Sequence, residues 1–160
     1  MQRILIALLV LCLLPFVGSQ IASAHCQVPC GIFADQARFE AMLEDATTIE
    51  KAQRLMGELA GKNDAQSMNQ YVRWVKTKEE HAANTQKVIA DYFMAQRIKP
   101  AQDTYVDRLM ASHAVMIAAM KCKQSADAAT AEALKTAILA FHKVYEPDAA
   151  KKSHDHGKDK

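Results

Sequence analysis

Three residues near the N-terminus, His25, Cys26 and Cys30, have the types and the spacing that a metal site needs. A free amine on His25 and the backbone nitrogen of Cys26 lie one residue apart, so together they close a five-membered chelate ring on a metal. The thiolate of Cys26 closes a second ring with its own nitrogen. Cys30 supplies a fourth donor if the chain turns, and Pro29 and Gly31 are residue types that favour turns. The donor set is then two nitrogens and two sulfurs in a plane, with the His25 imidazole above it.

This donor set predicts the metal and the class of chemistry. Planar sites with nitrogen ligands are typical of Ni(II) and Cu(II), whereas tetrahedral sulfur-rich sites suit zinc or iron. A deprotonated amide and two thiolates are strong donors, which stabilise the higher oxidation state and bring a Ni(III)/Ni(II) couple into a biological range. Such a site suits one-electron chemistry on a small molecule. The two cysteines could instead form a disulfide or a thiol redox pair.

The segment before His25 indicates how the amine becomes free. Arg3 precedes an apolar run over 4–17, and the segment ends in Ala-Ser-Ala, the small residues that a signal peptidase recognises. The run of about 14 residues is shorter than the ~20 that a membrane helix needs. We therefore expect residues 1–24 to be a signal peptide, removed after Ala24 by signal peptidase. The mature protein would be exported, periplasmic or secreted, without a stable membrane anchor, and the new N-terminus at His25 favours the metal over the disulfide.

Composition bounds the rest of the chain. Removal of 24 residues from a chain of 160 leaves 136, enough for one compact domain. One of the 20 basic residues leaves with the leader, so 19 face 18 acidic residues. This balance gives no argument for binding nucleic acid, and we expect none. Of the four cysteines, Cys12 leaves with the leader and Cys122 is predicted to be a lone thiol.

Helix-favouring residues and helical spacing predict an all-α fold. Glycine is scarce, and Ala, Leu, Met, Glu, Lys and Gln abound. Gly61 lies near the C-cap of the first predicted helix, and Asp64 suits the N-cap of the second. Short connections between amphipathic helices predict an antiparallel four-helix bundle carrying the N-terminal metal-binding hook. The four predicted helices cover about 35–59, 64–97, 102–121, and from 125 or 127 to just before 147.

The domain organisation follows from these elements. We assign 25–147 to the hook plus the bundle and 148–160 to a polar tail rich in lysine and histidine. In that tail His154 and His156 would bind divalent metal weakly at most. His113 and His142, without an acidic or cysteine partner at ligand spacing, are predicted to be structural or surface residues. The predicted buried residues are Phe39, Met42, Leu43, Ile49, Leu55, Met56, Leu59, Met68, Val72, Val75, Ala82, Ile89, Phe93, Tyr105, Leu109, Met116, Met120, Leu134, Ile138, Phe141 and Tyr145.

The hook also resembles a known family. The stretch HCQVPCGIF is similar to the start of mature nickel-containing superoxide dismutases, which read His-Cys-x-x-Pro-Cys-Gly-x-Tyr on a four-helix bundle. Weaker similarity follows in QARFE just after the hook, in KEEHA of the second predicted helix and in DYF near its end. The resemblance covers most of the first two helices, and the last two match in helical character only.

The resemblance implies a cofactor and a reaction. It assigns one nickel ion per subunit to the His25 amine, the Cys26 amide nitrogen and the thiolates of Cys26 and Cys30, with the His25 imidazole axial in the oxidised state. These three residues would be both metal ligands and the catalytic residues. The implied reaction is disproportionation of superoxide to oxygen and hydrogen peroxide while nickel alternates between +2 and +3. The implied assembly is a homohexamer.

Five further residues take supporting roles by the same resemblance. Glu40 would orient the histidine ring and His81 would be its basic partner, with Tyr92 a tyrosine near the metal and Pro29 part of the hook. Phe33 stands where the family has a tyrosine that guards nickel. Phenylalanine fills the volume but cannot order water or donate a proton, so we predict that nickel binding survives while the rate or the anion sensitivity changes.

Two other functions remain open from the sequence. The chain could be an exported helical protein that binds nickel or copper without turnover, using the hook and the tail. It could also be a thiol–disulfide protein that uses Cys26 and Cys30. The enzyme needs a free His25 amine and redox-active nickel, whereas the thiol protein tolerates an uncleaved N-terminus.

Overall fold

The computed structural model describes residues 35–146, and within them the chain is helical with no strand. The second element continues directly into the third without a break, so the five elements make four rods, which confirms the predicted all-helical fold. The elements are α2 (Gln36–Leu59), α3 (Ala65–Lys87), η2 (Val88–Arg97), α4 (Tyr105–Gln124) and α5 (Ala129–Tyr145).

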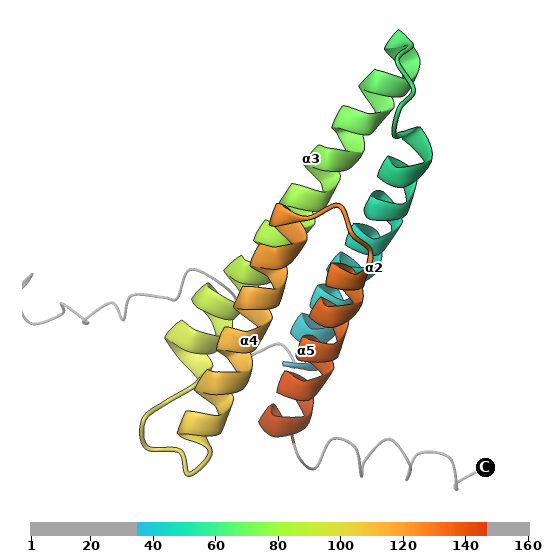
Figure 1. Cartoon of the computed structure of the whole chain (residues 1–160). Coiled ribbons are helices and arrows are strands. Elements are labelled where there is room, and N and C mark those ends of the chain that lie inside the picture. The colour runs from blue at the N-terminus through green and yellow to red at the C-terminus, as the bar shows by residue number, and fades with distance from the viewer. Residues whose placement is uncertain (1–34, 147–160) are drawn as a thin grey trace, which may run out of the picture.

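The rods form a four-cornered bundle (Figure 1). Helix α2 packs against α3 and α5, and α4 packs against α3, η2 and α5. Successive rods run in opposite directions, and the tip of the α2–α3 hairpin extends beyond the α4–α5 pair (Figure 1). The start of α2 and the end of α5 therefore lie together at the opposite end of the bundle. No helix among residues 35–146 is long and apolar enough to cross a membrane.

Two helix ends form through the local signals that the sequence carries. The Asp64 carboxylate accepts a hydrogen bond from the Ser67 backbone N–H at 2.9 Å, as an N-cap residue does. Gly61 has a φ of +80°, the left-handed conformation in which glycine ends helices without strain. Both predictions are confirmed.

The start of α4 differs from the prediction by about three residues. Instead of entering the helix, the Gln102 side chain accepts from the Lys99 N–H at 3.0 Å and donates to the Arg97 carbonyl at 3.2 Å. These bonds hold the turn after η2 together, so α4 begins only at Tyr105. Similarly, Asp127 accepts from the Ala129 N–H at 2.9 Å, and α5 begins after it.

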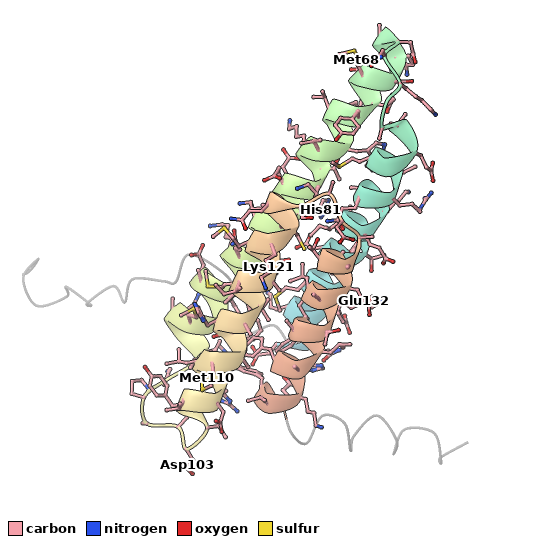
Figure 2. All side chains as sticks on the ribbon, in the orientation of Figure 1. Met68, His81, Asp103, Met110, Lys121 and Glu132 are labelled. Carbon is pink, nitrogen blue, oxygen red and sulfur yellow. The ribbon has the colours of Figure 1, made fainter. Side chains whose placement is uncertain are left out.

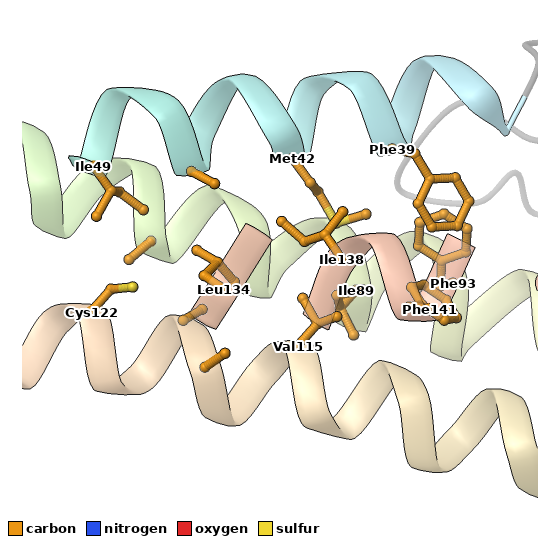
Figure 3. Packing of buried hydrophobic residues seen from close by; sticks show 14 of the residues in the cluster. Phe39, Met42, Ile49, Ile89, Phe93, Val115, Cys122, Leu134, Ile138 and Phe141 are labelled. Atoms are coloured by element: carbon orange, nitrogen blue, oxygen red, sulfur yellow. The ribbon is translucent and has the colours of Figure 1, made fainter. Parts of the chain in front are cut away.

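The core runs along the axis of the bundle (Figure 3). All four residues predicted for the buried side of the last helix are buried, as are most of those on the first. One end is aromatic: the Phe39, Phe93 and Phe141 ring centroids lie 4.9 to 5.2 Å apart. The largest buried hydrophobic side chains are Phe39, Met42, Ile49, Ile89, Tyr92, Phe93, Val115, Leu134, Ile138 and Phe141.

Three predicted core residues are instead exposed. Met68 and Val72 are 56% and 64% exposed, because they lie on the α2–α3 tip where neither α4 nor α5 stands opposite. Met120 is 45% exposed, because the inner face of α4 carries small residues, which let its neighbours approach closely. Those inner residues are Ser112, Val115, Ala118, Ala119 and Cys122. The other predicted residues that are not buried are partly buried: Leu43, Leu55, Leu59, Val75, Tyr105, Leu109 and Met116.

Candidate functional site

The predicted metal ligands His25, Cys26 and Cys30, together with Pro29 and Phe33, lie outside the described residues. So do the predicted signal peptide and the tail. Within 35–146, no group of three or more His, Cys, Asp or Glu side chains could hold a metal ion. What the structure does describe is the end of the bundle from which the hook segment extends.

A polar cluster occupies this end. Asp35, the first described residue, accepts a hydrogen bond from the Tyr92 hydroxyl on one carboxylate oxygen. Its other oxygen accepts from the Tyr145 hydroxyl at 2.9 Å and from Nη2 of Arg97 at 2.7 Å. We call these four residues the Asp35 cluster. It joins the start of α2 to η2 and to the last turn of α5.

The side chain of Asp35 does not cap α2, although its position directly before the helix would normally make it a capping residue. Aspartate directly before a helix usually caps it by accepting a backbone N–H bond with its side chain. Here the Asp35 side chain makes no such bond, and only its backbone carbonyl accepts from Arg38 N and Phe39 N. The carboxylate therefore bonds to side chains of η2 and α5 only. These contacts fix the position of Asp35, which we call the root of the hook segment.

The π-helical geometry of η2 explains how two of its residues reach the same carboxylate. Tyr92 and Arg97 are five residues apart, which in an α-helix would place them about 140° apart around the axis. In η2 the backbone bonds join residues five apart, as in Ile98 N to Phe93 O at 2.8 Å. This wider turn brings positions five apart nearer to one side. Helix was predicted here, but the π-helical turn was not.

The electrostatics of the cluster keep Asp35 ionised and the phenols protonated. Burial alone would raise the pKa of Asp35, but hydrogen bonds from Arg97, Tyr92 and Tyr145 outweigh it and hold that pKa below its usual range. Burial and the bond to Asp35 raise the pKa of Tyr92 to about 12. The same two causes raise the pKa of Tyr145 to about 12. At neutral pH these hydroxyls therefore act as hydrogen-bond donors.

Basic side chains surround the cluster. The guanidinium of Arg38 lies over the Tyr92 ring, 5.4 Å from its centroid, and that of Arg108 lies 4.7 Å from the Tyr145 centroid. Arg108 also donates to the Tyr145 carbonyl at 2.8 Å. Beside the cluster is an open cavity of about 400 Å³, lined by Asp35, Gln96, Arg97, Lys99, Gln102, Arg108, Tyr145 and Glu146.

Glu40 and His81, which the resemblance implied to be partners, do not contact each other in the structure. Glu40 is exposed and accepts from the Gln36 amide at 3.0 Å. His81 lies with Nδ1 2.6 Å from a carboxylate oxygen of Asp45, whose second oxygen accepts from the Thr85 hydroxyl at 3.2 Å. The structure thus pairs His81 with Asp45 instead of Glu40, because Asp45 is on the side of α2 that faces α3.

Two more predictions concern single residues. His142 stacks on Phe39 with centroids 4.3 Å apart, and its Nε2 lies 3.8 Å from Glu146, an acidic neighbour one turn away that the sequence prediction overlooked. His113 is exposed. Cys122 is buried and free; its thiol donates to the Thr130 carbonyl at 3.2 Å, and burial raises its pKa. It is thus the lone thiol that was predicted.

Comparison with known proteins decides the family. The family model for nickel-containing superoxide dismutase matches residues 20–149. The chain belongs to this family. No curated protein and no solved structure matches it. The match to the nickel superoxide dismutases includes the last two helices, where the sequence alone had shown only helical character.

Of the Asp35 cluster, sequence reasoning found only Tyr92. Asp35 was assigned to the first helix, Tyr145 to the core, and Arg97 to a helix end. Their partners lie 57, 62 and 110 residues from Asp35, so no local spacing joins them. The sequence did offer one signal, Tyr145 at the end of the apolar stripe of the last helix. A buried tyrosine hydroxyl needs a hydrogen-bond partner, so a polar residue could have been expected beside it.

Proposed function

We propose that this nickel superoxide dismutase binds one nickel ion per subunit through His25, Cys26 and Cys30. The observation that carries the proposal is the family match, which contains all three residues as well as the whole bundle. The donor set of amine, amide nitrogen and two thiolates fits a planar nickel site. In the reaction, two superoxide ions and two protons give one O2 and one H2O2, and bound nickel supplies the two one-electron steps as a Ni(III)/Ni(II) couple.

The Asp35 cluster gives the hook a fixed root. Asp35 lies five positions after Cys30 in the sequence. Because an extended chain spans at most about 3.3–3.6 Å per residue, the Cα atoms of these two residues lie within about 18 Å of each other. Ordering this root by side-chain hydrogen bonds lowers the entropy that the hook loses when it closes on a metal. The protonated phenols of Tyr92 and Tyr145 hold the carboxylate and do not compete for a metal.

Phe33, between the hook and Asp35, supplies volume without a polar group. In the family the guarding residue is a tyrosine, so this chain would shield its metal sterically while leaving water unordered on that side. Nickel binding is then retained, and the rate or the response to small anions changes. The roles of Pro29 in shaping the hook and of Glu40 in orienting the His25 ring belong to the same proposal.

Maturation and assembly complete the proposed function. Signal peptidase would remove residues 1–24 and so create the His25 amine, and the mature protein would act outside the cytoplasm. The subunits would form a homohexamer, as the family resemblance implies. The cleavage matters for the chemistry, because the backbone nitrogen of His25 is a free amine only after residues 1–24 are removed.

Native mass spectrometry of protein from the exported fraction of nickel-fed cells tests the proposal. We expect a chain that starts at His25 with one nickel per subunit, and superoxide-disproportionating activity in that fraction. Cys26→Ser and Cys30→Ser should each lose both nickel and activity. Cys122→Ser is the matched control and should keep both, because its thiol lies buried in the bundle.

Other outcomes would point to the other functions. Stoichiometric nickel or copper without turnover would indicate a metal-binding protein. A chain that retains residues before His25, or that carries a Cys26–Cys30 disulfide and no metal, would indicate a thiol or structural protein and would overturn the proposal.

A further inference from the structure

One face of α4 carries apolar side chains that the rest of the described bundle leaves exposed. Val106, Met110, Ile117 and Met120 are 62%, 68%, 43% and 45% exposed. With the exposed His113 between them they are spaced alternately four and three residues apart. At 3.6 residues per turn all five fall in a band about 80° wide and about 21 Å long. We call these five residues the α4 stripe.

The α4 stripe lies opposite the core-facing side of its own helix. The inner face of α4 is formed by buried residues such as Val115, Ala119 and Cys122, about half a turn away from the stripe. Alternating spacings of three and four are the pattern by which one helix packs along another. The helix thus has two packing faces, of which the described bundle covers one. Met110, in the stripe, and Lys121, beside it, are labelled toward the two ends of α4 in Figure 2.

Two charged residues flank the α4 stripe on the same side. Asp107 follows Val106 at one end and Lys121 follows Met120 at the other, and both are exposed. Neither has an ion-pair partner among residues 35–146. They are placed symmetrically about residue 114, close to the middle of the stripe. A parallel copy of α4 would therefore place Asp107 level with Asp107 and Lys121 level with Lys121 on opposite sides of the contact, without an ion pair. An antiparallel copy instead sets each Asp107 beside a Lys121 on the same side.

We infer that two copies of this chain pair through their α4 stripes, antiparallel, across a two-fold axis near His113. The contact buries the four apolar residues of each copy and forms two Asp107–Lys121 ion pairs between subunits. Such a self-complementary contact closes a dimer and leaves other surfaces to join dimers into a larger ring or stack. The inference rests on the proposed homo-oligomer and names the surface and the orientation of one contact within it.

The first test measures the subunit count of the full mature chain by light scattering and sedimentation velocity. We expect Met110→Glu and Ile117→Glu each to reduce the subunit count at least twofold, because either places a charge in the middle of the contact. Met68→Glu is the matched control, since Met68 is 56% exposed but lies on α3, and it should keep the parent count. Unchanged counts in both stripe variants, or a monomeric parent at micromolar concentration, would overturn the inference.

The second test fixes the orientation by charge reversal. Asp107→Lys alone and Lys121→Asp alone each turn both ion pairs into repulsions, and should weaken association by about tenfold. The double variant Asp107→Lys/Lys121→Asp restores opposite charges in an antiparallel pair and should recover the parent affinity. Failure of the double variant to recover would show that the helices do not pair antiparallel.

These tests can be read separately from the proposed metal function. The assembly is measured on metal-free and on nickel-loaded protein, with circular dichroism to show that each variant is folded. A parent that assembles through α4 but binds no nickel would contradict the proposed function and leave the contact intact. If the parent turns over superoxide but every α4 variant keeps the parent subunit count, the inferred contact would be overturned and the proposed function would stand.

Discussion

Two carboxylates at α2, Asp35 directly before the helix and Asp45 within it, show what burial does and does not decide. Their side chains are similarly buried, at 10% and 12% exposure. Yet the pKa of Asp35 is lowered, whereas burial raises the pKa of Asp45 despite hydrogen bonds from His81 and Thr85. A permanent cation and two hydroxyls outweigh the loss of water around Asp35, and a histidine and one hydroxyl do not around Asp45.

The two carboxylates also differ in what they connect. Asp45 links α2 to α3, which already pack together along their length. Asp35 links the residue directly before α2 to η2 and α5, so its bonds hold the start of α2 against two elements that are distant in sequence. Loss of Asp35 should therefore affect whatever precedes it, whereas loss of Asp45 should be absorbed by the surrounding packing.

The largest expected effect is that of Asp35→Asn. Breaking a fully buried ion pair costs ~3–5 kcal/mol, but Arg97 is 36% exposed and water can replace part of the bond, so we expect a loss of about 2 kcal/mol in unfolding free energy. We also expect nickel affinity to fall. Denaturant unfolding and nickel titration measure the two effects. Asp103→Asn, in the exposed loop before α4, is the control.

A smaller effect is expected for Tyr145→Phe. The variant keeps the ring in the aromatic end of the core and removes one of three hydrogen bonds to Asp35, which should cost about 1 kcal/mol. The same variant tests the raised phenol pKa, because Tyr92 and Tyr145 both contribute to the component near 12 in the ultraviolet titration of the parent, and Tyr145→Phe should lose about half of that component's amplitude. A loss of amplitude near the ordinary tyrosine pKa of about 10, with the component near 12 unchanged, would show that Tyr145 ionises as an exposed tyrosine does.

Asp45→Asn should be milder still. An amide oxygen can accept from Thr85 as the carboxylate does, and the fold holds the ionised form of Asp45 unfavourably, so we expect a change of about 0.5 kcal/mol or less in unfolding free energy. Nickel binding should not change. A loss equal to that of Asp35→Asn would remove the distinction between the two carboxylates.

The smallest expected effect is on how unfolding free energy depends on pH, where Asp35 and Asp45 should contribute with opposite signs. Asp35 has a lowered pKa, so its contribution is present above the usual carboxyl pKa and is lost as pH falls through the folded-state pKa. Asp45 has a raised pKa, so its contribution is present below the usual pKa and is lost as pH rises through the folded-state value. Each slope should stay below the ~1.4 kcal/mol per pH unit of one full proton.

Unfolding free energies of the parent and the two asparagine variants, measured from about pH 3 to pH 7, test these signs. Asp35→Asn should flatten the acid side of the curve, and Asp45→Asn should make stability rise more steeply with pH. Parallel curves for all three proteins would contradict both assignments.

How far the sequence predicts this fold depends on the range of each contact. The end of α2 and the start of α3 could be placed because the signals at Gly61 and Asp64 depend only on residues a few positions away. The inner face of α4 was misjudged at Met120, because hydropathy ranks methionine above the alanines that form the close helix contact. Periodicity shows that a helix has an apolar stripe but not which of two stripes meets the core.

The site was predictable to the extent that it is local. The hook ligands are contiguous in sequence, so their spacing alone indicates a metal. The Asp35 cluster depends on three elements and on a π-helical turn that aligns Tyr92 with Arg97, and nothing in the composition of that segment predicts the change of helix type. The pairing of His81 with Asp45 was missed for a related reason, since only the packing of α2 on α3 selects one acidic residue over another.

The meeting of the two ends of the described domain at one cavity has a practical consequence. Ten residues lead from Asp35 back to His25, and fourteen lead from Glu146 to the C-terminus, with two histidines among them. At about 3.3–3.6 Å per extended residue, both lengths are long enough to reach the same space. A polyhistidine purification tag fused behind Lys160 would be tethered beside the hook and compete with it for nickel. Metal content is thus best measured on tag-free protein, or with the tag removed before loading.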